Sequence, residues 1–231
     1  NLASTVNGGF GLTLNGNTGV TLGGIIGGTT ALSSLAVTGA TNLNGSSVTT
    51  TGIQTYNSAA TLGTGFAANG TSISFASTIA GGGNSLTINN SGASSVAGVI
   101  SGTGTTLTKS GTGTLTLSNG ASTYTGITSV TGGTLSIGTL ANSASNSSIG
   151  TAGSVTLSGT GVLSYTGGAA STDRTFNIGA SGGTIQNAGS GLLTLNGTLA
   201  NAGNALTIDT NTANITASGA ITGAGSLTKL G

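Results

Sequence analysis

The chain of 231 residues contains no cysteine, proline, histidine, methionine or tryptophan, and only five of its residues are charged. Without cysteine it has no disulfide or thiolate–metal framework, and without histidine it lacks the most common general base. Three cations cannot neutralise a run of phosphates, and they form no basic amphipathic face. We therefore expect no cofactor, no nucleic-acid partner and no electrostatic attachment to a membrane surface.

Carboxylates are almost absent as well. Asp173 and Asp209 are the only two, and they lie 36 residues apart. Polysaccharide-cleaving enzymes work with paired carboxylates, and calcium-binding repeats need a recurring aspartate beside their glycines. We therefore expect neither catalysis nor metal binding.

Long apolar runs are also missing. The longest, such as Val96–Ile100, fall far short of the ~20 residues that cross a bilayer as a helix, so we expect no membrane insertion by this segment. No signal peptide is visible and residue 1 is asparagine, which favours a processed piece of a longer chain. We expect that longer polypeptide to continue beyond both ends of this segment.

Glycine, serine, threonine and asparagine dominate, and the apolar residues between them are regularly placed. "TLTL" at 114–117, "TLSI" at 134–137 and "SVTL" at 154–157 follow one another at steps of twenty residues. Polar and apolar residues alternate within each tetrad, which is the period of a strand with one buried face. The pattern predicts two inward ladders of stacked side chains. They are Leu115, Leu135 and Val155 in one, and Leu117, Ile137 and Leu157 in the other.

A period of two nested in a period near twenty is typical of a solenoid. We therefore predict an all-β fold, a right-handed parallel β-helix with coils of about 20 residues and a spacing of about 4.8 Å between coils. The absence of proline fits this fold, because proline removes a hydrogen-bond donor from the strand ladder. The 46 glycines fit tight corners between strands.

A longer period is present too. Residues 73–111 and 193–231 share 13 of 39 positions at an offset of 120 residues, including "LTI" and "LTK". Six coils of about 20 residues would make one such unit. We therefore expect residues 1–231 to form one continuous β-solenoid segment with a repeat of about 120 residues.

The stretch "LTKSGTGTLTLSNGASTYTGITSVTGGTL", Leu107 to Leu135, resembles the passenger-associated transport repeat of bacterial autotransporters, also called the autotransporter-associated β-strand repeat. It differs from the usual pattern in one extra residue before Tyr124 and in Ile127. The segment from Ser34 to Gly63 looks like parts of large bacterial surface proteins with β-strand repeats, and Ser171–Leu195 is similar to segments that lie between such repeats.

This resemblance implies a secreted, right-handed β-helix displayed on the bacterial surface. The function expected is structural or adhesive, as part of an autotransporter-like passenger or a giant surface protein. The alternative is a subunit of a self-assembling extracellular filament or surface layer. The partners expected are further copies of its own repeat, in the same chain or in stacked subunits, and host or cell-surface ligands.

The charged residues leave alternatives open. Asp173 and Arg174 form either a spot that binds a partner or a corner where Asp173 caps a turn and Arg174 reaches neighbouring carbonyls; we favour the corner. Lys109 and Lys229 occupy the same place in the two sequence copies, and we expect both on a solvated coil edge that discourages misplaced strand pairing.

The three tyrosines, Tyr56, Tyr124 and Tyr165, allow two interpretations. They either stack against a bound carbohydrate or pack over the corners of coils. We favour packing.

Overall fold

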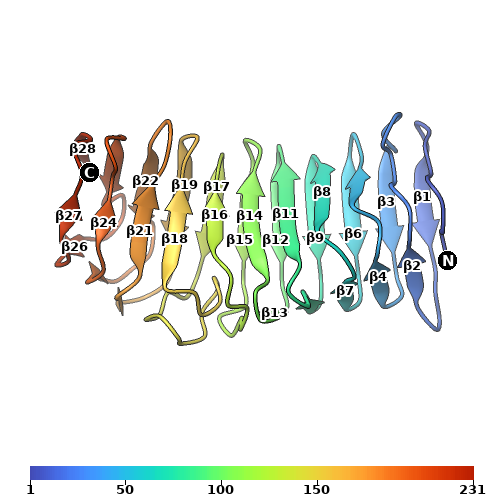
Figure 1. The fold of residues 1–231 in the computed structure, drawn as a ribbon, viewed down its shortest axis with the longest axis horizontal. Helices are drawn as coiled ribbons and strands as arrows, with labels where there is room; N and C mark the ends of the chain where they lie inside the picture. Colours follow the sequence, from blue (N-terminus) through green and yellow to red (C-terminus); the bar gives the residue numbers. More distant parts are fainter.

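In the computed structural model, which describes residues 1–231, the chain forms a rod of stacked coils with its two termini at opposite ends (Figure 1). It contains 28 β-strands and no helix, and every pair of strands in its sheets is parallel; the one antiparallel contact is an isolated bridge between Ser122 and Ser147. The predicted all-β parallel solenoid is confirmed. None of its segments is a helix long and apolar enough to span a membrane.

The strands belong to four sheets that run along the rod. The eleven-stranded sheet contains, in spatial order, β1 (Gly11–Leu14), β3 (Ser34–Val37), β6 (Ile53–Tyr56), β9 (Ser72–Phe75), β12 (Ala93–Val96), β15 (Thr114–Leu117), β17 (Thr134–Ile137), β19 (Gly161–Tyr165), β22 (Gly183–Asn187), β25 (Leu206–Asp209) and β28 (Leu227–Leu230). The nine-stranded sheet contains β5 (Ser47–Thr49), β8 (Phe66–Gly70), β11 (Ser85–Asn90), β14 (Thr106–Ser110), β16 (Thr128–Val130), β18 (Ser154–Leu157), β21 (Thr175–Ile178), β24 (Leu199–Ala200) and β27 (Ile221–Thr222).

Two shorter sheets complete the coils. The five-stranded sheet contains β2 (Val20–Leu22), β4 (Thr41–Leu43), β7 (Ala60–Leu62), β10 (Ile79–Ala80) and β13 (Ile100–Ser101). The three-stranded sheet contains β20 (Ala170–Thr172), β23 (Leu193–Leu195) and β26 (Ile215–Ala217). Except for β2, each strand of these two sheets is followed in the chain by a strand of the nine-stranded sheet. A typical coil therefore has three strands, and between β13 and β20 the third face has no strand.

One hydrophobic cluster of 41 buried residues fills the rod from coil to coil. Strand β15 shows how the sequence builds it, because Leu115 and Leu117 are buried while the threonines beside them are exposed. The aromatic residues join the same core. The rings of Tyr56 and Phe75 stack with their centroids 4.4 Å apart, and Phe66 meets Tyr56 edge-on at 6.5 Å. Burial on this scale is the main source of stability, since no disulfide contributes.

The predicted ladders need a correction. Leu115 pairs with Leu135, and Leu117 pairs with Ile137, in β15 and β17 of the eleven-stranded sheet. The next rung is not Val155 and Leu157 but Leu163 and Tyr165, on β19. Val155 and Leu157 lie inward on a different sheet, where β18 pairs with β16 and β21. The prediction that they extend these ladders is wrong.

The reason is an insertion in the coil. Twenty residues separate the paired Leu115 and Leu135, whereas 28 separate Leu135 from its partner Leu163. Residues 138–153, between β17 and β18, make the extra length and form a loop that is visible beneath β18 in Figure 1. We call residues 138–153 the excursion. Val155, twenty residues after Leu135, therefore lies on the nine-stranded sheet and not on the eleven-stranded sheet that carries Leu135.

The 120-residue sequence repeat does not return to the same face either. Leu107 and Lys109 lie on β14 of the nine-stranded sheet, but their sequence partners Leu227 and Lys229 lie on β28 of the eleven-stranded sheet. From β11 to the matching β25 the chain makes five coils and advances one further strand. The expected six coils per unit is therefore wrong, and the two sequence copies are displaced by one face around the rod.

Candidate functional site

The ionisable groups are spread along the chain, apart from the neighbouring Asp173 and Arg174. No three residues among histidine, cysteine, aspartate and glutamate lie close enough to hold a metal ion. The Asp209 carboxylate accepts hydrogen bonds from the side-chain nitrogen of Gln186 at 2.8 Å and from the backbone N–H of Asn211 at 3.0 Å. These contacts fix a turn and involve no second ionisable group.

Lys109 does not lie on a solvated edge, and that expectation is wrong for it. Its side chain is buried, because it points inward between Ile88 and Val130 of the neighbouring coils. Its ammonium donates to the carbonyls of Ser110, Gly111 and Gly132, at 2.6, 3.0 and 3.2 Å. Three N–H donors thus meet three acceptors, and the group closes the corner of its coil. Burial lowers the pKa of Lys109 to about 8.

Lys229 is exposed. It lies on β28, which pairs with β25 alone. Its ammonium contacts the carbonyl of Leu230 at 3.3 Å and the carbonyl of Gly231.

Arg174 and Asp173 together hold the excursion against the rod. Arg174 is fully buried, and its guanidinium donates to the carbonyls of Ala141 at 2.9 Å and Gly150 at 2.8 Å. Further acceptors are the carbonyls of Asn142, Ser145 and Ala152 and the hydroxyl of Ser147. The Asp173 carboxylate accepts the backbone N–H of Ser143 at 2.6 Å and its hydroxyl at 3.2 Å.

This geometry matches the corner interpretation of the pair. A single guanidinium satisfies carbonyls that would otherwise be buried without donors. The backbone hydrogen bond from Ser143 is the main cause of a lowered pKa at Asp173. The pair therefore positions a loop, and Arg174 is fully buried, so its guanidinium is not accessible to a partner.

The tyrosines are buried, so none offers a ring face to a carbohydrate. Tyr124 packs beneath the excursion, and its hydroxyl lies 2.7 Å from that of Thr128. Burial raises the pKa of both Tyr56 and Tyr124 above the ordinary value. The interpretation that uses these rings as a stacking platform is wrong.

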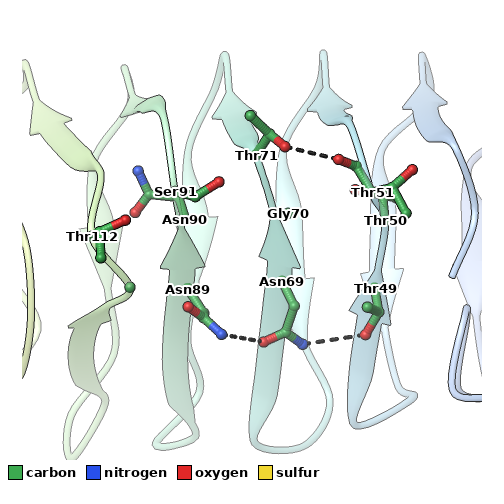
Figure 2. A pocket seen from close by; sticks show the side chains of 11 residues that line it. Thr49, Thr50, Thr51, Asn69, Gly70, Thr71, Asn89, Asn90, Ser91 and Thr112 are labelled. Carbon is green, nitrogen blue, oxygen red and sulfur yellow. Dashed lines mark hydrogen bonds between the residues drawn. The ribbon is translucent and has the colours of Figure 1, made fainter.

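One groove marks the surface, and sequence reasoning missed it. It lies where the chain leaves β5, β8, β11 and β14, and it has a volume of about 370 Å³. Its wall consists of residues 49–51, 69–71, 89–91 and 111–112, none of them hydrophobic (Figure 2). We call this the corner groove. The available signal was a cluster of threonine and asparagine that recurs every 20 to 22 residues.

Hydrogen bonds order the wall of the corner groove from coil to coil. The side-chain nitrogen of Asn89 donates to the side-chain oxygen of Asn69 at 3.1 Å, and Asn69 donates to the Thr49 hydroxyl at 3.4 Å (Figure 2). The Thr71 hydroxyl donates to the backbone carbonyl of Thr51 at 2.8 Å. The groove is therefore a regular array of amides and hydroxyls at the spacing of the coils.

Comparison with known proteins supports the resemblance seen in the sequence. Residues 107–137, which include β15, β16 and β17, match the passenger-associated-transport-repeat family. Over 126 residues, 53% of the chain, the sequence is 31% identical to the adhesin BmaC autotransporter of Brucella suis biovar 1 (strain 1330). The matched part is only 3% of that relative's length. No solved structure matches the chain. The chain thus contains, at residues 107–137, a segment that matches the passenger-associated-transport-repeat.

Proposed function

We propose that the chain is part of the extracellular, adhesive passenger of an autotransporter-like surface protein, and that it works without catalysis. The passenger-associated repeat at residues 107–137 is the observation that carries this proposal. The likeness to an autotransporter adhesin supports it, although that relative is far longer than this chain.

The rod geometry suits such a role. Parallel pairing links each coil to the next along eleven strands of one sheet, and the hydrophobic cluster is continuous through the interior. Stiffness of this kind keeps a binding surface away from the cell that displays it. The outer side chains are mostly hydroxyls and amides, which hydrate well and can form many weak hydrogen bonds with a partner surface.

Adhesion can be tested directly with the purified chain. Beads coated with it should adhere to cultured epithelial cells more than beads coated with serum albumin, and soluble chain should compete for the same sites. Beads carrying heat-denatured chain serve as the control for folding. Adhesion equal to that of albumin beads, or adhesion that soluble chain does not reduce, would contradict the proposal.

A further inference from the structure

Asparagine followed by glycine is a reactive pair in a chain that otherwise has few reactive groups. The backbone nitrogen of the second residue can attack the side-chain amide carbon of the asparagine, and glycine places no side chain in the way. The attack requires a nitrogen free of hydrogen bonds, an amide that can turn back to it and a backbone that can bend between them. The pair occurs at Asn7, Asn15, Asn44, Asn69, Asn119 and Asn196.

The fold engages the glycine nitrogen in the pairs that begin at Asn7 and Asn44. The backbone N–H of Gly8 donates to the Thr30 carbonyl at 3.1 Å, and that of Gly45 donates to the Leu22 carbonyl at 2.7 Å. Either nitrogen would have to break a hydrogen bond to a neighbouring coil before it could attack. These two pairs are therefore protected while the coils stay stacked.

Two further pairs are held by packing. Within β8 the Asn69 side chain accepts a hydrogen bond from Asn89 at 3.1 Å and donates one to Thr49 at 3.4 Å, so it is fixed on both sides. Gly197, which follows Asn196, is buried, and the backbone carbonyl of Arg174 fills the space beside its α-carbon. Neither backbone can bend toward the amide without disturbing its neighbours.

The pair of Asn15 and Gly16 is restrained through its side chain. The backbone nitrogen of Gly16 donates to no acceptor, so it is free to react. The Asn15 side-chain oxygen, however, accepts the hydroxyl of Thr38 on the next coil at 2.8 Å. The amide must leave this contact before it can turn back on its own backbone, and we therefore expect Asn15 to react slowly.

Asn119 alone meets all three conditions. It lies beyond the end of β15, where Gly120 is exposed and its backbone nitrogen donates to no acceptor. The Asn119 side-chain oxygen accepts the backbone N–H of Ala121 at 2.8 Å, which makes an Asx turn. The hydrogen-bonded ring of this turn includes the Gly120 nitrogen, so the side chain already curls back along the backbone. The same hydrogen bond draws electrons away from the amide carbon, and the amide has no hydrogen bond to another coil.

We propose that Asn119 and Gly120 form a site of spontaneous deamidation in the folded protein. The Gly120 nitrogen loses its proton and bonds to the amide carbon of Asn119, and the side-chain nitrogen leaves as ammonia. One molecule of solvent water then opens the resulting cyclic imide at either of its carbonyls. The product is aspartate or isoaspartate at position 119, and the reaction needs no enzyme, metal or oxidant. This inference does not depend on the proposed adhesive function.

Either product changes this part of the rod. One neutral amide becomes one anion within residues 107–137, so the formal net charge of the chain falls from +1 to 0. Isoaspartate also lengthens the main chain by one carbon just before Ser122, whose hydroxyl accepts the backbone N–H of Ile100. Thr139, in the excursion, lies next to Gly120. The site therefore records the age of the protein as an irreversible change of charge beside the excursion.

The test compares the purified chain when folded and when unfolded in urea, during incubation in mildly alkaline buffer. Samples are digested rapidly with pepsin in acid, and mass spectrometry measures the deamidated fraction at each asparagine of the six pairs. We expect Asn119 to react in the folded chain at close to its rate in urea, and severalfold faster than Asn15. Asn69 is the internal control, because it should react readily in urea and hardly at all in the fold.

Two further measurements identify the chemistry. Hydroxylamine cleaves a cyclic imide, so brief treatment of the aged, folded chain should cut it between Asn119 and Gly120. Isoelectric focusing should show an acidic species that grows with time, and faster at higher pH, because the Gly120 nitrogen must lose its proton. Asn119→Gln keeps an amide but would have to close a larger ring, so this variant should form the acidic species severalfold more slowly.

Three results would refute the site. They are deamidation of Asn119 in the folded chain that is no faster than that of Asn69, earlier deamidation of any other pair, and an acidic species that grows equally fast in Asn119→Gln. Should Asn119→Gln fail to fold, the rates measured at each pair of the unmodified sequence still decide the question.

Discussion

The ammonium of Lys109 lies inside a rod that is otherwise filled with apolar side chains, and this makes stability depend on pH. Burial lowers its pKa from 10.5 to about 8, so the folded chain holds this proton less tightly than the unfolded chain does. Stability rises with pH wherever the unfolded state binds more protons. We expect the free energy of unfolding to increase between pH 8 and pH 10, as measured by urea denaturation.

Above about pH 10 the tyrosines act in the opposite direction. Because burial raises the pKa of Tyr56 and Tyr124, they stay protonated in the fold while the unfolded chain loses their protons. Stability should therefore fall again in stronger alkali. Lys109→Met provides the control, since it should remove the rise between pH 8 and 10 and keep the later fall. A rise that persists in Lys109→Met would assign it to another group.

Arg174 should matter more to stability than its position between two short strands indicates. Arg174→Lys keeps the charge but not the planar fork that reaches several carbonyls at once. Each buried carbonyl left without a donor costs about 1–3 kcal/mol, and we expect a total loss of at least ~3 kcal/mol. Urea denaturation measures the loss, and limited proteolysis should cut within residues 141–152 of the variant first. If neither the free energy of unfolding nor the protection of residues 141–152 from proteolysis changed, the excursion would keep its place without Arg174.

At the scale of the strand, the ladders can be tested by placing a charge inside one. Leu135 lies between Leu115 and Leu163 on adjacent strands and is fully buried. Leu135→Asp would bury a carboxylate without a partner, which costs several kcal/mol (about 3–5 by analogy with a broken buried ion pair). Thermal denaturation should show a large drop for this variant. Thr116→Asp, on the exposed side of β15, is the matched control and should change stability by less than about 0.5 kcal/mol.

The strands themselves were predictable from the sequence because the alternation in "TLTL" or "SVTL" depends only on the pleat of a strand. Which strands stack on each other was only partly predictable. Val155 stands twenty residues after Leu135, yet the excursion lengthens that coil and moves Val155 to the nine-stranded sheet. Nothing in the composition of residues 138–153 distinguishes an insertion from ordinary turn residues.

Burial of polar groups was the least predictable property. A lysine in a chain of this kind suggests an exposed edge, and only the three carbonyls around its ammonium make burial of Lys109 tolerable. The corner groove was equally hidden, because it depends on four corners from four coils lying side by side.

For the molecule as a whole, few groups titrate or bind metals, and this predicts insensitivity to its surroundings. The chain has no histidine, and the pKa of Asp173 is lowered, so its contribution is lost only as the pH falls below the usual aspartate range near 4. We expect the melting temperature to stay flat from pH 5 to pH 8 and to be unchanged by EDTA. Calorimetry checks both. A marked increase on adding Ca²⁺ would show that a metal site exists after all.

The displacement of the sequence repeat by one face has a consequence for how such a rod meets its surroundings. In any polypeptide built of several such units, a motif placed once per unit would point in a new direction each time and would complete the circuit of a three-faced rod after three units. The copies of that motif would then follow a helical path around the long axis of the rod. A tethered rod of this kind would present a copy of the motif to a neighbouring surface at any rotation about its long axis. No single side of it would have to face its target.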